Sequence, residues 1–160
     1  MNKSKIKTFA IWARQKLMDD IRGNASLIGI TEAQIYDPLS QSTSGIQYFD
    51  IGTNEPYALS GDDILNRDKI VVDLKATAKD ENYKTAYTNM IEHTASTWFN
   101  RLAAIRIMEV NDYFDDGLRV LSSVNKGSKD SDLMIAPFES DIEFTEQERQ
   151  SIIDWKLNNS

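Results

Sequence analysis

Three residues in the first half of the chain have side chains that could support phosphodiester chemistry. Asp73 and Lys75 follow the β-prone run 70–72, and an acid and a lysine with this spacing after a strand are typical of metal-dependent nucleases. In such sites carboxylates bind Mg²⁺ and the lysine positions or activates a water molecule. Asp63, or its neighbour Asp62, would supply the further acid that the site requires. Because the same segment has helical apolar spacing, a solvent-facing helix surface is the competing interpretation.

Other common catalytic constellations are missing from the sequence. It has no cysteine and one histidine, His93, which excludes a thiolate zinc site, a cysteine nucleophile and a site with several histidines. Its seven glycines form neither of the usual phosphate-binding loops. Residues 54–57 resemble the Asn-Pro-Pro-Tyr loop of DNA adenine methyltransferases, but glutamate replaces the first proline, so we interpret them as a turn. We predict no catalytic, cofactor-binding or metal-binding residue, with a small Mg²⁺-dependent nuclease using Asp63, Asp73 and Lys75 as the alternative.

Basic and acidic residues are distributed unevenly along a chain whose net charge is −7. Residues 1–22 contain six basic and two acidic residues, whereas residues 109–160 contain twelve acidic and five basic residues. A basic leading helix could neutralise DNA phosphates. A solvated helix surface, or packing against the acidic end, explains the same charges and is favoured by the negative total. The candidate DNA-phosphate contacts are Lys3, Lys5, Lys7, Arg14 and Lys16.

Apolar spacing predicts a mainly α-helical fold organised around one long central helix. The pattern of three- and four-residue steps is strongest over residues 81–112. β-branched and aromatic residues at 46–51, followed by turn-forming residues, predict a small β-hairpin near 46–59. We expect a single α-rich domain over residues 1–160. Further helices are predicted over residues 4–22, 61–79 and from 145 towards the end of the chain.

Local signals predict where several of these helices begin and end. Residues 23–24 are a Gly-Asn pair that can end the first helix. Thr31 is a candidate cap for a short helix at 31–36. Ser60 begins a shortened capping box, and residues 145–148, Thr-Glu-Gln-Glu, form a complete one.

Charged residues lie in or beside the apolar face of the central helix. Arg106 and Glu109 are three residues apart and can pair on the helix surface, and Arg101 lies nearby in the sequence. Because a buried charge must be paired and hydrogen-bonded, we predict a structural ion-pair network of these three residues. The predicted hydrophobic core comprises Phe9, Ala13, Leu17, Tyr87, Ile91, Trp98, Leu102 and Ile105.

Neither a membrane span nor an export signal is predicted. No run approaches the roughly 20 apolar residues of a span. No apolar stretch of about 7–15 residues follows the N-terminal lysines, as a signal peptide requires. We therefore expect a cytoplasmic protein without a membrane partner.

Several blocks of the sequence are similar to the N-terminal region of one protein family. The most specific block is WFNRLAAIRIMEVN at residues 98–111, and QYFDIGT at 47–53 is another. Matching blocks also occur at residues 1–17, 28–31, 119–123 and 144–146. The chain thereby resembles the PglX-type adenine-specific DNA methyltransferases of the BREX phage-defence system, which are also described as methylase subunits of type II restriction enzymes.

The resemblance implies that the chain is a fragment of a much longer protein. Such a parent transfers a methyl group from S-adenosylmethionine to adenine N6 in DNA. Its cofactor loop and its Asn-Pro-Pro-Tyr motif lie downstream of the matched region. The resemblance therefore predicts a non-catalytic N-terminal helical module of a restriction-modification or BREX enzyme. Its implied roles are to support the methyltransferase core, to contact DNA, or to bind another defence-system protein.

Overall fold

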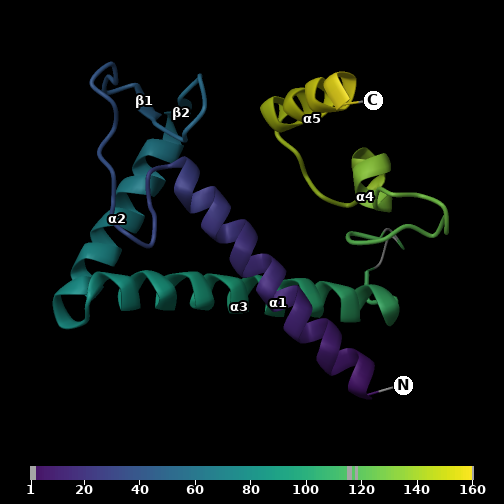
Figure 1. The fold of residues 1–160 in the computed structure, drawn as a ribbon. Coiled ribbons are helices and arrows are strands. Elements are labelled where there is room, and N and C mark those ends of the chain that lie inside the picture. The colour runs from purple at the N-terminus through teal and green to yellow at the C-terminus, as the bar shows by residue number, and fades with distance from the viewer. Residues whose placement is uncertain (1–2, 115–116, 118, 160) are drawn as a thin grey trace. The chain divides into compact units, whose positions relative to one another are not determined.

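Helices make up most of the chain in the computed structural model, which describes residues 3–114, 117 and 119–159 (Figure 1). The predicted fold class, mainly α with a small β-hairpin, is confirmed. The chain divides into two compact units, Met1–Arg101 (unit 1) and Leu102–Ser160 (unit 2). The elements are α1 (Lys3–Leu27), β1 (Ile46–Phe49), β2 (Tyr57–Ser60), α2 (Asp62–Asp80), α3 (Tyr83–Val110), α4 (Asp132–Ile135), the 3₁₀ helix η1 (Pro137–Glu139) and α5 (Glu146–Asn159).

The first helix, α1, continues past the predicted stop at residues 23–24 and ends at Leu27, so that prediction was wrong. Gly29 has a φ of 73°, and the N–H of Ile30 donates to the carbonyl oxygen of Ala25 at 2.9 Å. This hydrogen bond and the left-handed glycine form a Schellman C-cap. Ala25 is buried, so its packing keeps the chain helical through a Gly-Asn pair that by itself favours a stop.

The segment after α1 is a tight turn and not the predicted short helix at 31–36. Ile30 and Ile35 form an isolated antiparallel bridge. The Thr31 hydroxyl donates to the carbonyl oxygen of Gln34 at 2.9 Å and accepts from the Gln34 N–H at 3.3 Å. A threonine side chain supports a turn and a helix start through the same kind of hydrogen bond, which explains why the sequence pattern misled the prediction.

The predicted hairpin is confirmed close to its predicted position. β1 and β2 pair in antiparallel fashion, with Ile46 opposite Ser60 and Phe49 opposite Tyr57. Phe49 is 1% exposed and Leu59 is 6% exposed, and both pack against the start of α2. The hairpin therefore packs one apolar side against α2 within unit 1.

The second helix, α2, follows the hairpin directly and confirms the helix predicted there, so the β-prone run 70–72 is helical. Ser60 does not cap this helix because it belongs to β2. The N-cap is Gly61, which has a φ of 59° and makes no side-chain hydrogen bond. The predicted capping box was therefore wrong. Asp62 and Asp63 in the first turn instead interact favourably with the helix dipole.

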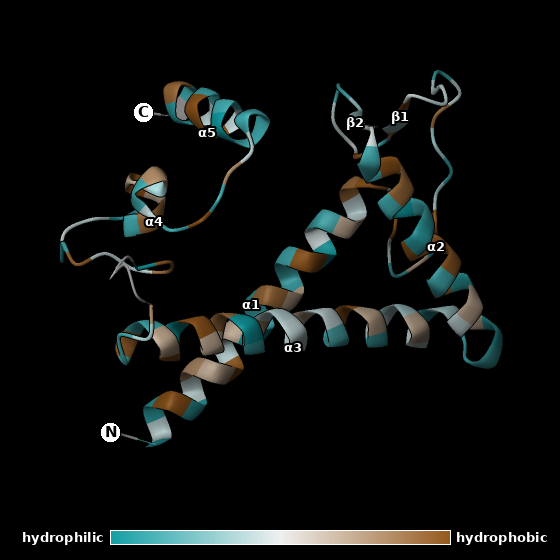
Figure 2. Ribbon diagram, turned by 180° about the vertical axis from the view of Figure 1, so that it is seen from behind, coloured by the Kyte–Doolittle hydropathy of each residue, from teal (hydrophilic) through white to brown (hydrophobic). Residues whose placement is uncertain are grey.

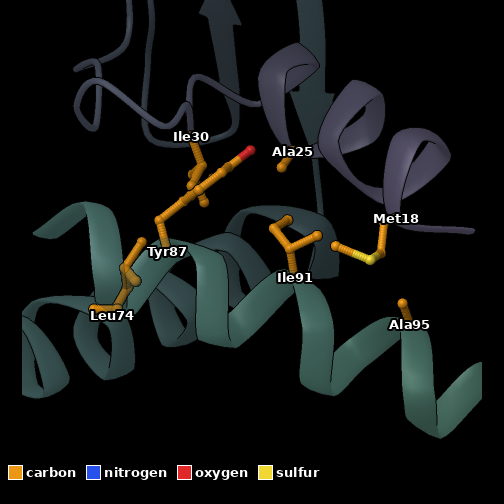
Figure 3. Close-up of a cluster of buried hydrophobic side chains, with 8 residues drawn as sticks. Met18, Ala25, Ile30, Leu74, Tyr87, Ile91 and Ala95 are labelled. Carbon is orange, nitrogen blue, oxygen red and sulfur yellow. The ribbon is translucent and has the colours of Figure 1, made fainter. Parts of the chain in front are cut away.

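The hydrophobic core of unit 1 lies where α1, α2, α3 and the turn after α1 meet (Figure 3). Ile30, Ile91 and Ala95 are completely buried, and Tyr87 is 4% exposed. Full burial of an aliphatic side chain such as isoleucine contributes roughly 1.5–3 kcal/mol, so this cluster fixes how the three helices pack. The core cluster comprises Met18, Ala25, Ile30, Leu74, Ala86, Tyr87, Ile91 and Ala95.

The predicted core is correct only in part. Tyr87 and Ile91 are buried, but Phe9 is 59% exposed and Trp98 is 47% exposed. Phe9 precedes every member of the core cluster on α1, and Trp98 follows every member on α3. Hydrophobic residues nevertheless continue along α1 towards its N-terminal end (Figure 2). Periodicity identified the apolar helix faces but not how far along each helix a partner covers them. The other predicted core residues are half-buried: Ala13, Leu17, Leu102 and Ile105.

Unit 2 contains short helical elements joined by loops. The N–H of Thr145 donates to the Glu148 carboxylate at 2.8 Å, and the N–H of Glu148 donates to the Thr145 hydroxyl at 3.3 Å. The predicted capping box at the start of α5 is therefore confirmed. The rings of Phe138 and Phe144 meet edge to face with centroids 5.9 Å apart. Lys156 Nζ donates to the last carbonyl oxygen of α4 at 2.6 Å, which links α5 to α4.

Candidate functional site

The three residues of the alternative nuclease site all lie on α2 and are exposed. Asp73 and Lys75 are two positions apart on a helix, so their side chains point to different sides. Asp63 lies ten residues before Asp73, which is roughly 15 Å along the axis of α2. Among residues 3–114, 117 and 119–159, no group of three or more His, Cys, Asp or Glu side chains could hold a metal ion. The strand-borne arrangement that the nuclease interpretation requires is therefore not formed.

Asp63 lines a cavity of about 430 Å³ in unit 1. Its lining comes from α1, the turn after α1, β2, α2 and α3 and is mostly aliphatic. Asn24 and Asn66 also line this cavity and add side-chain amides to its lining. With a single carboxylate in the lining, the cavity is better suited to an apolar group than to a divalent cation.

Arg67 is a buried charged residue that the sequence analysis did not single out. It is 5% exposed, and its Nε and Nη2 donate to the carbonyl oxygens of Ile28 and Tyr36, each at 2.8 Å. Its guanidinium carbon lies 4.4 Å from the ring centroid of Phe49. Burial lowers the pKa of Arg67 below its usual range, but an arginine stays protonated in proteins. Arg67 therefore joins α2 to the turn after α1 and to the hairpin.

The predicted pair of Arg106 and Glu109 is formed in unit 2, with Arg106 Nη1 2.8 Å from Glu109 Oε2. Glu109 is 2% exposed, and its carboxylate also accepts from the backbone N–H of Leu121. Arg106 Nη1 donates in addition to the Ser122 hydroxyl at 2.7 Å. Burial by itself raises the pKa of Glu109, but the hydrogen bonds from Leu121 and Arg106 outweigh burial and hold that pKa below its usual value. The pair therefore links the segment around residue 121 to the end of α3.

Arg101, the third residue of the predicted network, has an aromatic partner in unit 1. Its guanidinium carbon lies 5.6 Å from the ring centroid of Trp98. This cation–π contact lies at an exposed ring, where such contacts contribute roughly 0.5–1 kcal/mol. The contact explains how an arginine beside the apolar face of α3 can remain at the surface.

The five candidate DNA contacts on α1 form two groups. Arg14 Nη2 lies 3.3 Å from Glu92 Oε2, and Lys16 Nζ lies 2.7 Å from Asp20 Oδ1. The hydrogen bond to Asp20 raises the pKa of Lys16. These two cations are therefore already paired with acids of unit 1. The remaining three are exposed near the start of the helix: Lys3, Lys5 and Lys7.

An aromatic pair, Phe9 and Trp12, lies among these basic residues. The two side chains are 59% and 61% exposed, and their ring centroids are 5.9 Å apart. They border an open hollow that also includes Lys5 and Thr8. Exposed aromatic rings beside cations occur on surfaces that bind nucleic acids and on surfaces that bind proteins.

The remaining sequence motifs form no additional site. Residues 54–57 belong to the hairpin turn and the start of β2, in agreement with the turn interpretation. His93 is exposed on α3. In the part of the chain that the structure describes, no helix is both long enough and apolar enough to span a membrane.

Comparison with known proteins finds relatives among adenine-specific methyltransferases. The chain is 44% identical over 126 residues, 79% of its length, to adenine-specific methyltransferase PglX of Lacticaseibacillus casei (strain Zhang). It is 61% identical over 33 residues, 21% of its length, to adenine-specific methyltransferase BrxX of Escherichia coli O9:H4 (strain HS). It spans 10% of the first relative and 3% of the second. No family model and no solved structure matches the chain.

Proposed function

This chain is related over most of its length to PglX-type adenine-specific methyltransferases, as its sequence blocks predicted, and we propose that it is the non-catalytic N-terminal helical module of such an enzyme. The observation that carries the proposal is the asymmetry of the match, since 79% of this chain aligns with only 10% of the relative. A segment of 126 residues has the usual length of one protein domain. Most of the relative's length therefore lies outside the match and is available to bind the cofactor and the target base.

The proposed parent enzyme transfers a methyl group from S-adenosylmethionine to adenine N6 in DNA, within a BREX or restriction-modification defence system. The 160 residues contain neither the glycine-rich loop that usually binds a nucleotide nor an Asn-Pro-Pro-Tyr motif. Their absence supports placing cofactor binding and base recognition outside this module. The role left for the module is to support the methyltransferase core or to bind other macromolecules.

Exposed apolar side chains support a role in contacts with other protein. Large hydrophobic residues are exposed on α1, α2, α3 and α5, including Ile11 at 62% and Val72 at 65%. Apolar surface that is exposed in an isolated unit often marks an interaction site. The core cluster and Arg67 hold the described part of unit 1 together. We therefore favour a structural module that packs against the methyltransferase core over a module with chemistry of its own.

The test compares the full methyltransferase polypeptide, the same polypeptide without the module, and the 160-residue chain alone. We expect adenine methylation of cellular DNA, measured by methylation-sensitive sequencing, from the full polypeptide only. We expect isothermal titration to show S-adenosylmethionine binding to the full polypeptide and none to the 160-residue chain. Saturable binding by the chain alone, or full methylation without the module, would contradict the proposal.

A second candidate role, contact with DNA phosphate, is supported by the exposure of Lys3, Lys5 and Lys7. Each phosphate contact contributes about 0.9 to the slope of log K against log salt concentration. We expect the triple lysine-to-glutamine variant of the full polypeptide to lower this slope for duplex DNA by up to about 2.7. The matched control is the triple variant of exposed lysines on α2: Lys69, Lys75 and Lys79. Equal slopes of log K against log salt concentration for the two triple variants would contradict a DNA-binding role of Lys3, Lys5 and Lys7.

A further inference from the structure

A stripe along one side of α1 has the residue pattern of a helix that docks in a groove. Lys5, Phe9, Trp12 and Lys16 are spaced by four, three and four residues, which places them on one side of the helix. We call these four residues the α1 stripe. Met18 and Ala25, which pack into the core cluster, fall outside this spacing, so the stripe and the core use different sides of α1.

The centre of the α1 stripe is aromatic and open to solvent. Phe9 and Trp12 remain more than half exposed, and their rings lie side by side with centroids 5.9 Å apart. The hollow beside them also includes Ser4 and Thr8. Adjacent aromatic anchors at helical spacing are the feature by which a helix binds in an apolar groove.

Both charged residues of the α1 stripe, Lys5 and Lys16, are basic. The other basic residues in the range 3–16 lie on the opposite side of α1 and do not border the stripe: Lys3, Lys7 and Arg14. Lys16 is paired with Asp20, one helical turn further along α1. This ion pair is exposed, with a side-chain exposure of 60% for Lys16, so a partner can reach the cation. A complementary surface is therefore apolar at its centre and acidic at its rim.

We propose that the α1 stripe docks in an apolar, acid-rimmed groove on the part of the methyltransferase polypeptide outside the matched segment. This inference rests on the proposed function. The matched segment is 10% of the PglX relative, so the remaining polypeptide is large enough to present such a groove. Protein is favoured over duplex DNA because the centre of the stripe is aromatic, whereas a duplex presents mainly phosphate and sugar to an approaching helix.

Hydrogen–deuterium exchange measured by mass spectrometry tests this docking in the full methyltransferase polypeptide. We expect amides of residues 5–16 to exchange at least tenfold more slowly in the full polypeptide than in the 160-residue chain. The double variant Phe9→Ser/Trp12→Ser should lose this protection. The matched control is Leu65→Ser/Val72→Ser, which changes two exposed apolar residues of α2 and should keep it. Circular dichroism of both variants checks that the helices remain folded.

The outcomes separate this inference from the proposed function. Unchanged exchange at residues 5–16 in a full polypeptide that methylates adenine overturns the docking and leaves the proposed function intact. Equal loss of protection in the stripe variant and the control variant also overturns the docking. Protection that appears only after duplex DNA is added assigns the stripe to DNA and overturns a protein groove. A full polypeptide without adenine methylation overturns the proposed function, and the inference fails with it.

Discussion

The two units of the chain are stabilised by different kinds of contact. In unit 1 the buried residues are mainly apolar, and every buried hydrophobic side chain of the core lies between Met18 and Ala95. In the part of unit 2 that the structure describes, the buried residues are Glu109, Ser131 and Pro137. Unit 1 therefore depends on hydrophobic burial, and unit 2 depends on a few polar side chains that hold its loops.

Hydrogen bonds in unit 2 show what replaces a hydrophobic core. The Asp132 carboxylate accepts from the Ser123 hydroxyl at 2.6 Å and from the N–H of Val124 at 3.1 Å. Ser131 caps α4 by accepting from the N–H of Met134 at 3.3 Å. Each such bond contributes only about 1 kcal/mol net, but a buried group that loses its partner costs more. Unit 2 should therefore respond to acid and to single polar substitutions, and unit 1 to truncation of apolar side chains.

The largest effect is expected in the core of unit 1, from Ile91→Ala. Ile91 is completely buried, so the variant loses buried apolar area and leaves a cavity. We expect the free energy of unfolding, measured with urea, to fall by roughly 4 kcal/mol. The control Ile11→Ala changes an isoleucine that is 62% exposed and should have little effect. Similar losses for the two variants would show that unit 1 lacks the apolar core that distinguishes it from unit 2.

The next effect is expected from Arg67→Met, which tests whether unit 1 also depends on a polar contact. The methionine keeps part of the apolar stem but leaves the carbonyl oxygens of Ile28 and Tyr36 without their donor. We expect the free energy of unfolding to fall by about 3 kcal/mol. Arg67→Lys should recover only part of this loss, because an ammonium lacks the planar fork of donors. Full recovery by lysine would mean that charge alone is sufficient at this position.

In unit 2 the expected effect of Glu109→Gln is about 2 kcal/mol, because the variant removes charge-assisted hydrogen bonds from a buried site. Hydrogen exchange should report the loss at the amides around residue 121 and not at those around Ile91. Loss of protection in both units would mean that they unfold together. The control Glu146→Gln changes an exposed acid of α5 and should leave these amides unchanged.

The same substitution also predicts how acid acts on unit 2. The pKa of Glu109 lies below the ordinary value of 4.5 in the folded chain. The carboxylate therefore contributes stability above pH 4.5, and this contribution is lost as the pH falls through the lower, folded pKa. The stability difference between the natural chain and Glu109→Gln should be constant near neutral pH and shrink in acid. A difference that is unchanged at pH 3 would show that the ionised form is not what Leu121 and Arg106 recognise.

The fold class and most helices could be predicted because their signals are local. The capping box at residues 145–148 is contained in four residues, and the apolar spacing of α3 repeats over many turns. The end of α1 could not be predicted, because it depends on the burial of Ala25 by residues distant in sequence. The exposure of Phe9 could not be predicted either, because periodicity does not show where a neighbouring helix stops covering a face.

The candidate site residues also divide into those with a local sequence signal and those whose partners are distant in the sequence. The pair of Arg106 and Glu109 was predicted from a three-residue spacing on one helix. Arg67 was missed, although it follows Ile64 by three residues and therefore lies in the apolar stripe of α2. A basic residue in such a stripe is a usable signal for a buried polar contact. Its partners, the carbonyls of Ile28 and Tyr36, could not be identified because they lie 39 and 31 residues away.

Trp98→Ala is expected to have the smallest effect and tests where the core of unit 1 ends. A tryptophan at the centre of a core would cost roughly 3–5 kcal/mol, but this ring is 47% exposed and has Arg101 beside it. We therefore expect a loss of about 1 kcal/mol in urea unfolding, from the buried half of the ring and the cation–π contact. The control Trp12→Ala, at 61% exposed, should cost less still. A loss above roughly 3 kcal/mol for Trp98→Ala would place the ring in a buried core and extend the apolar core of unit 1 beyond Ala95 on α3.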